Sequence, residues 1–135
     1  QGLRIQAARL GLGARVHFLG FRHDVAVLMR AADVVVHTSM LPEPFGRVIV
    51  EGMLAGRPVI ATAAGGVGEI LDDGRTGLLV PPGNAAAIAA AVQALRTDPA
   101  RAAAISAAGA AHARATFGLG AMVRGVRAVF DEVAP

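Results

Sequence analysis

Glu43 and Glu51 are the carboxylates whose spacing indicates chemistry, because they lie on either side of a predicted helix start at Gly46. The first amides of a helix have no partner within it, and the helix dipole favours an anion at that end. Gly46 has no side chain, so a phosphate could approach the backbone there. Glu51 would lie roughly 7–8 Å further along the helix axis. This arrangement suits an elongated ligand with hydroxyls at both ends and phosphate between them, and a nucleotide-sugar is such a ligand.

The same spacing has two other interpretations. Glu51 could belong to the polar face of an amphipathic helix, paired with Arg47 one turn earlier, while Glu43 is a solvated loop residue. A glycosidase acid and nucleophile pair is the second alternative, since such carboxylates lie about 5–9.5 Å apart. That chemistry needs a groove for an oligosaccharide, and no feature of the sequence indicates one.

Other motifs give weaker signals. The run GVGEIL (66–71) imitates a dinucleotide-binding fingerprint, but Leu71 stands where the third glycine belongs. His37 follows a predicted strand and is a candidate to line the crevice in which a ligand would lie. No pair of histidines has the spacing of metal ligands.

The elements that must position these residues alternate along the chain. Apolar β-rich runs predict strands at 15–20, 33–37, 58–62 and 77–82, and the run 33–37 is typical of a strand buried on both faces. Helical patterns are predicted at 3–11, 24–32 with Asp24 as N-cap, 45–55, 67–71, and from 84 onward with breaks at 98–99 and near 118. The residues expected to face the core from the helix 45–55 are Phe45, Val48, Ile49 and Met53.

Alternating strands and helices with short connections predict an α/β fold. We expect a Rossmann-like parallel sheet of about four strands with helices on both faces. In such sheets a ligand lies beyond the carboxyl ends of the strands. The loops 38–46 and 62–69 leave two of these ends, so they are where we expect the site.

Composition narrows the class of protein further. The chain has 135 residues, of which 54% are hydrophobic, which is enough for one domain with one core. It has no cysteine, which excludes disulfides and thiolate chemistry and fits a cytoplasmic location. The net charge of +3 comes from arginines scattered from Arg4 to Arg127, without Tyr or Trp to stack on bases, so we expect no nucleic-acid partner. No apolar run reaches the length of a membrane span.

The longer string PEPFGRVIVEGMLAGRPVIAT, followed by GGVGEIL and DGRTGLLVPPGN, resembles a known family. It is similar to the nucleotide-sugar-binding, C-terminal half of the retaining glycosyltransferases of family 4, which have the GT-B fold. The segments LGLGARVHFLGF and AADVVVHTSMLPEPFG match preceding parts of the same family, so the resemblance covers essentially the whole chain. One departure is Gly68, at a place where the family often has proline.

The resemblance implies roles for the loop and the helix start. Glu43 would be the catalytic-site carboxylate that receives hydroxyls of the donor sugar. The backbone amides of Phe45 and Gly46, together with Arg47, would face the sugar and the diphosphate.

It also implies roles for the nucleoside end of the donor. Glu51 would bind the ribose hydroxyls, and Val48 would pack near the ribose. The backbone around Gly20 and Phe21 would lie nearest the base. The family is metal-independent, so the resemblance implies no metal and no cofactor, with the nucleotide-sugar as substrate.

The resemblance further implies that residues 1–135 are a single partial domain, truncated at its N-terminus. The family's donor half opens with a strand, a helix and a second strand that this sequence lacks, and an N-terminal domain binds the acceptor, which is a sugar, a lipid or a small molecule. We therefore expect a transferase whose isolated fragment is inactive, with peripheral membrane association of the parent enzyme as an option. The alternatives are a nucleotide-sugar epimerase of the same fold and a non-catalytic binding module. Without the missing strands, we expect the runs 16–19 and 34–37 to pair directly, in a sheet ordered 16–19, 34–37, 58–62, 77–80.

Overall fold

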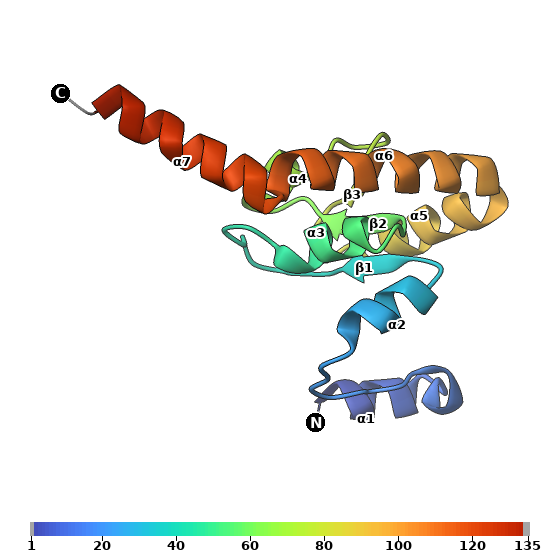
Figure 1. The fold of residues 1–135 in the computed structure, drawn as a ribbon. Helices are drawn as coiled ribbons and strands as arrows, with labels where there is room; N and C mark the ends of the chain where they lie inside the picture. Colours follow the sequence, from blue (N-terminus) through green and yellow to red (C-terminus); the bar gives the residue numbers. More distant parts are fainter. Residues whose placement is uncertain (1, 134–135) are drawn as a thin grey trace.

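A computed structural model describes residues 2–133 of the chain (Figure 1). Its elements follow in the order α1 (Gly2–Arg9), η1 (Gly13–Arg15), α2 (Val25–Ala31), β1 (Val35–His37), α3 (Arg47–Leu54), β2 (Val59–Thr62), α4 (Val67–Ile70), β3 (Leu78–Val80), α5 (Ala85–Thr97), α6 (Pro99–Phe117) and α7 (Leu119–Val133). Every strand is thus followed by a helix, as the sequence predicts.

The three strands form one parallel sheet in the order β1-β2-β3. Val36 pairs with Ile60, and Ile60 pairs with Leu78 on the other side. The central strand β2 is buried along its whole length, as expected for a strand covered on both faces. The prediction of an α/β fold with a parallel sheet is confirmed.

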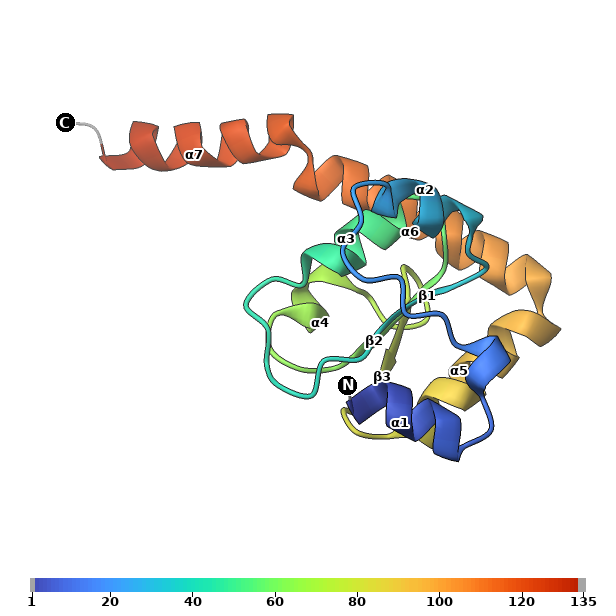
Figure 2. The ribbon, with the colours of Figure 1, turned by 90° about the horizontal axis from the view of Figure 1, so that it is seen from below.

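Helices cover both faces of this sheet, with α3 and α6 on one side and α5 on the other (Figure 2). Val59 and Ala61 of β2 belong to the core under α3 and α6, whereas Ile60 belongs to the core under α5. This alternation follows from the period of two in a strand. α3 packs closely on the sheet because a Cβ at Gly52 would lie only 3.0 Å from Val59 and 3.1 Å from Val35.

Helices α5 and α6 begin where polar side chains cap them. Asn84 accepts a hydrogen bond from the amide of Ala87, and Asp98 accepts one from the amide of Arg101. Both side chains thus satisfy amides that would otherwise lack a partner. The predicted breaks at 98–99 and near Gly118 separate α5, α6 and α7.

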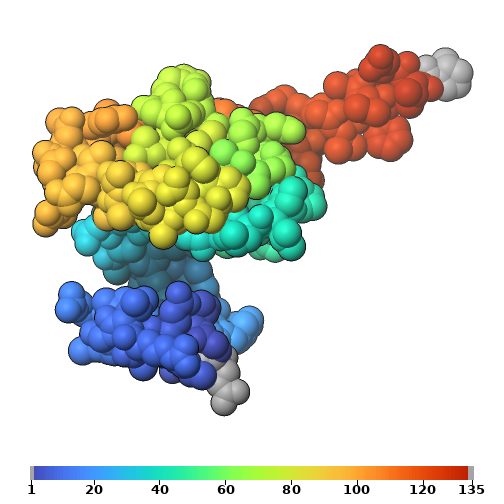
Figure 3. Space-filling view, turned by 180° about the vertical axis from the view of Figure 1, so that it is seen from behind, coloured from blue at the N-terminus to red at the C-terminus, as the bar shows by residue number. Residues whose placement is uncertain are grey.

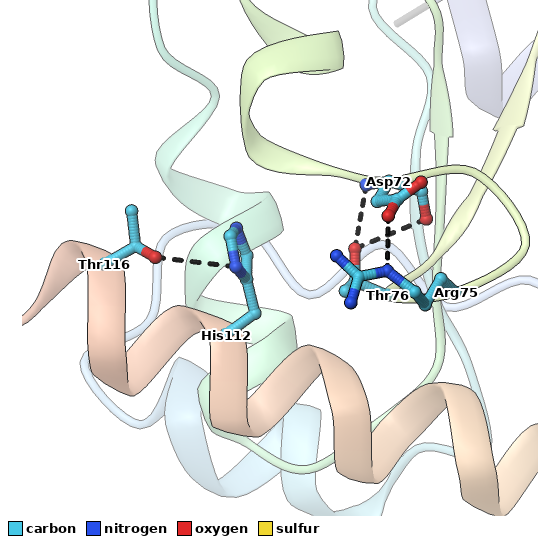
Figure 4. A network of polar contacts seen from close by, with 5 residues as sticks. All are labelled: Asp72, Arg75, Thr76, His112 and Thr116. Atoms are coloured by element: carbon cyan, nitrogen blue, oxygen red, sulfur yellow. Dashed lines mark hydrogen bonds and ion pairs between the residues drawn. The ribbon is translucent and has the colours of Figure 1, made fainter.

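The turn after α4 is held by polar contacts among its own residues and lies close to α6 (Figure 4). Thr76 Oγ1 accepts a hydrogen bond from the amide of Asp72 at 2.8 Å, and Arg75 forms an ion pair with Asp72. Gly109 lets α6 approach this turn, since a Cβ there would lie 2.7 Å from the carbonyl oxygen of Thr76. Further along α6, Thr116 Oγ1 lies 3.5 Å from His112 Nδ1.

The predicted first strand is absent. Residues 16–20 form no strand, and β1 has no partner on that side among residues 2–133. The expected fourth strand and its direct pairing with 34–37 were therefore wrong. This segment instead contacts α1: Arg4 donates a hydrogen bond to the carbonyl of Phe18 at 3.4 Å, and its guanidinium lies 4.7 Å from the ring centroid. Figure 1 shows α1 and this segment beneath α2, away from the sheet. Apolar β-rich composition favours a strand, but a strand needs a ladder partner within reach.

Two expectations about burial were also wrong. β1 is buried on one face only, because Val36 at the free edge is 37% exposed. Phe45 and Val48 do not face the core, whereas Ile49 and Met53 do. Phe45 lies before the first turn of α3 and stacks edge-to-face on Phe117 of α6, with 5.5 Å between ring centroids.

Asp24 stands at the start of α2, as predicted, but its carboxylate does not cap the helix. It forms an ion pair with Arg22 at 2.6 Å instead. The hydrogen bond from Arg22 holds the pKa of Asp24 below its ordinary value. The carboxylate therefore binds the neighbouring Arg22 guanidinium rather than the first amides of α2.

Two segments project from the body. Figure 3 shows the N-terminal residues as a separate lobe and α7 as an extended arm. No helix within residues 2–133 combines the length and the apolar content needed to cross a membrane.

Candidate functional site

The candidate site lies where the loops after β1 and β2 meet, beyond the carboxyl ends of these strands. Glu43 forms a parallel β-bridge with Gly65, and the amide of Gly66 donates to the carbonyl of Glu43 at 3.0 Å. Thr62 Oγ1 donates to the carbonyl of Ser39 at 2.7 Å. The sequence predicts the convergence of these two loops, and the structure confirms it.

Two glycines make this convergence possible. A Cβ at Gly65 would lie 2.5 Å from the carbonyl oxygen of Glu43, and a Cβ at Gly66 would lie 2.5 Å from that of Pro44. Gly65 also has a φ of 61°, in the left-handed region that favours glycine. The sequence predicts a site in the loop 62–69 but gives no signal that its glycines determine the placement of Glu43.

The Glu43 carboxylate contacts a buried histidine. His37 Nε2 lies 3.1 Å from Glu43 Oε2, and the side chains are 8% and 38% exposed respectively. A Cβ at Gly46 would lie 3.7 Å from the same oxygen, so the carboxylate sits beside the start of α3. Sequence analysis proposed His37 for the crevice from its place at a strand end, but it had no signal for this partner.

The start of α3 offers free backbone amides. Gly46 is its N-cap, with φ 64° and ψ 56°, and no side chain caps the helix. Among residues 2–133, the amides of Phe45, Gly46, Arg47 and Val48 donate no hydrogen bond. Together with the helix dipole, these amides can receive an anion next to Glu43.

Arg47 and Glu51 form the ion pair that the simpler interpretation predicts. Arg47 Nη2 lies 3.3 Å from Glu51 Oε1, one turn apart on α3, with side chains 83% and 43% exposed. An exposed pair of this kind contributes about 0–1 kcal/mol. Such a weak contact leaves both groups available to a ligand.

Glu51 also lines an open groove of 390 Å³ between α2 and α3. His23, Met29 and Arg30 line it from the other side. Glu43 and Val48 are not among its lining residues. The two carboxylates therefore do not line this groove together, and in the chain the start of α3 lies between them.

Of the two residues expected near a base, Phe21 contacts a residue of this groove, whereas Gly20 lines a separate hollow beside α1. Gly20 has a φ of 67°, and Phe21 after it is exposed. The Phe21 ring stacks edge-to-face on His23, with 4.8 Å between centroids. His23 thus connects Phe21 with the groove of Glu51, a connection for which the sequence gives no local signal.

Within residues 2–133, no three side chains of histidine, aspartate or glutamate gather as metal ligands would. The site contains one carboxylate that contacts a histidine, a helix start with free amides, and a second carboxylate beside a groove. The amides can donate hydrogen bonds to an anion, and the two carboxylates can accept hydrogen bonds from hydroxyl groups.

A parallel α/β sheet covered by helices on both faces, with polar loops beyond its strand ends, is of the Rossmann-like class. The family of Glycosyl transferases group 1 matches residues 1–112, and the chain belongs to this family.

Curated relatives are similar over most of this chain. D-inositol 3-phosphate glycosyltransferase of Streptomyces scabiei is 40% identical over 121 residues, which cover 87% of this chain and 26% of the relative. Phosphatidyl-myo-inositol mannosyltransferase of Mycobacterium leprae is 44% identical over 95 residues, covering 69% of this chain and 25% of the relative. The chain thus spans about a quarter of the length of the curated relatives it matches.

Solved structures are similar to nearly the whole of this chain. Anabaena Alr3699/HepE in complex with UDP is 41% identical, with a TM-score of 0.94, over 98% of this chain and 36% of that one. The same protein in complex with UDP-glucose aligns with a TM-score of 0.92. The fold of this chain is therefore that of the C-terminal part of a GT-B glycosyltransferase.

Proposed function

We propose that this chain supplies the nucleotide-sugar site of a retaining glycosyltransferase of family 4. The observation that carries the proposal is the placement of Glu43 and Glu51 on either side of a helix start whose amides are free. The likeness to a structure that holds UDP-glucose supports the same assignment.

In this proposal each part of the site receives one part of the donor. Glu43 accepts hydrogen bonds from hydroxyls of the sugar and orients it while charge develops at the anomeric carbon. The amides of Phe45 and Gly46, with Arg47, face the diphosphate. These fixed donors stabilise the negative charge that builds up on the leaving group, and we propose that they do so without a metal ion.

The nucleoside end of the donor lies toward the groove of Glu51. Glu51 accepts hydrogen bonds from the ribose hydroxyls, and Val48 packs near the ribose. The backbone at Gly20 and Phe21 lies nearest the base.

We further propose that residues 1–135 form one part of a longer donor-binding domain, and that the acceptor binds to a domain outside this chain. The polypeptide that contains all of these segments is called the parent protein below. The share of each relative that this chain covers, about a quarter, supports this division. The absence of cysteine fits our proposal that the enzyme works in the reducing cytoplasm.

The test is the stereochemistry of transfer by the parent protein. The parent protein is screened for the donor it uses among UDP-glucose, UDP-galactose, UDP-N-acetylglucosamine and GDP-mannose, with release of nucleotide as the readout. The anomeric configuration of the product is then read by NMR. We expect an acceptor-dependent product that keeps the donor's configuration. An inverted product contradicts the retaining assignment, and conversion of the donor to its epimer without transfer would favour the epimerase alternative.

A further inference from the structure

His37 is held in place by the sheet rather than by the loop that carries Glu43. It is the last residue of β1 and is in register with Ala61 of β2. More than nine-tenths of its surface is buried. Its Nε2 lies 3.1 Å from Glu43 Oε2, while its buried Nδ1 has no hydrogen-bond partner among residues 2–133.

The unpartnered Nδ1 identifies the tautomer of the ring. In neutral histidine one ring nitrogen donates and the other only accepts, whereas in the cation both donate. A donor that is buried without an acceptor costs more than a buried acceptor with a spare lone pair. In the contact with Glu43, the proton therefore lies on Nε2, which donates to the carboxylate, while Nδ1 has no acceptor to which it could donate.

We propose that His37 is a positioning residue for Glu43 in the transfer reaction. This inference rests on the proposed function, in which Glu43 orients the donor sugar. The Nε2–H group of His37 engages Oε2 and leaves Oε1 to receive sugar hydroxyls. Since Gly65 and Gly66 fix the backbone of Glu43, the histidine restricts the freedom that remains in its side chain.

The other carboxylate has no comparable support. The partner of Glu51 is Arg47, a long side chain that is 83% exposed, whereas the partner of Glu43 is a buried ring on a strand. Preorganisation accelerates a reaction only at groups that act in the transition state. The side chain of Glu43 is thus more restricted than that of Glu51. This difference fits the proposed roles, in which Glu43 acts on the reacting sugar and Glu51 binds the ribose.

The test compares two substitutions of similar volume in the parent protein. His37→Gln keeps an N–H donor near the position of Nε2, and His37→Met removes it. We expect His37→Met to lower kcat by about 10- to 100-fold, the range typical of a misplaced catalytic group, with donor KM changed less than about threefold. His37→Gln should stay within about fivefold of the wild type in kcat. If Gln and Met lower kcat equally, the histidine has only a packing role and the proposal is wrong.

A double-mutant cycle separates this inference from the proposed function. In a Glu43→Ala background, His37→Met should change kcat by less than about twofold, because residues that act through one another are not additive. If Glu43→Ala alone has wild-type kinetics, the proposed function fails. If Glu43→Ala lowers kcat but His37→Met does not, only the role of His37 fails.

The tautomer can be read without any variant. A long-range ¹H–¹⁵N spectrum of the 135-residue chain distinguishes the two neutral forms of His37 from each other and from the cation. We expect the proton on Nε2 alone. A proton on Nδ1 alone would leave no donor for Glu43 and would overturn the proposal, even if the variants fail to fold.

Discussion

Glu43 and Gly65 are joined by a parallel β-bridge, and a Cβ at Gly65 would lie 2.5 Å from the carbonyl oxygen of Glu43. The two residues come from loops that leave different strands. Their contact fixes the backbone of the carboxylate that we assign to the donor sugar. The position of Glu43 therefore depends on the absence of a side chain more than twenty residues further along the chain.

Gly65→Ala in the parent protein should therefore displace Glu43. We expect kcat to fall at least about tenfold, as for other misplaced catalytic groups, and the free energy of unfolding to fall by more than the 1–3 kcal/mol or so of a strained backbone. Gly56→Ala is the matched control, because Gly56 has a φ of 70° but no atom within 4 Å of its would-be Cβ. The control should lose stability through strain alone and keep its kcat. If Gly65→Ala and Gly56→Ala lose equal stability and both keep the wild-type kcat, the contact between Gly65 and Glu43 has no role in placing the carboxylate.

Two other glycines should respond in opposite directions to the same substitution. Gly52→Ala places a methyl group 3.0 Å from Val59 and 3.1 Å from Val35, and such overpacking typically costs about 1–3 kcal/mol. Gly68 in α4 has open space at its Cβ, so Gly68→Ala should stabilise the protein by about 0.4–1 kcal/mol through the unfolded chain. Denaturant unfolding of both variants measures the difference. A destabilised Gly68→Ala would mean that α4 needs the freedom of glycine.

The 135-residue chain on its own should not transfer sugar. Under our proposal, the acceptor site and the remainder of the donor-binding domain lie outside it. We expect no release of nucleotide above background from UDP-glucose, with or without added Mg²⁺ or Mn²⁺. Turnover by this chain, with any of the donors in the screen above, would contradict the division of the enzyme that we propose.

The order of helices and strands could be predicted from the sequence because its signals are local. The run at 58–62 is apolar throughout, and it becomes the fully buried β2. Asp98 followed by proline predicted a break, and it is the boundary between α5 and α6. These signals agree with the packing that surrounds them, which is why they were reliable.

Errors arose where the outcome depended on a distant partner. The run 16–19 has strand composition, but it lies against Arg4 of α1 and has no ladder. Phe45 has the character of a core residue, but it precedes the helix and stacks on Phe117 instead. Sequence periodicity gives the character of each residue, whereas the partner depends on how elements far apart in the chain come together.

In the candidate site, too, local features could be predicted from the sequence and contacts between distant segments could not. Glu43, Gly46 and Glu51 could be selected from their spacing around a helix start, which is a local feature. The contact of His37 with Glu43 and the approach of Gly65 could not, because both depend on how the loops after β1 and β2 converge. The roles that we propose for these residues remain predictions.

The most direct test of the central claim is a comparison of Glu51→Ala and Glu43→Ala in donor kinetics of the parent protein. Loss of a contact made equally in the ground state and the transition state raises KM, whereas loss of a contact made in the transition state lowers kcat. For Glu51→Ala we expect donor KM to rise about tenfold or more with kcat within about threefold. For Glu43→Ala we expect kcat to fall about 100-fold with a smaller change in KM. Wild-type kinetics in both variants would contradict the account and leave Glu51 as the surface partner of Arg47 and Glu43 as a loop residue without a role in catalysis.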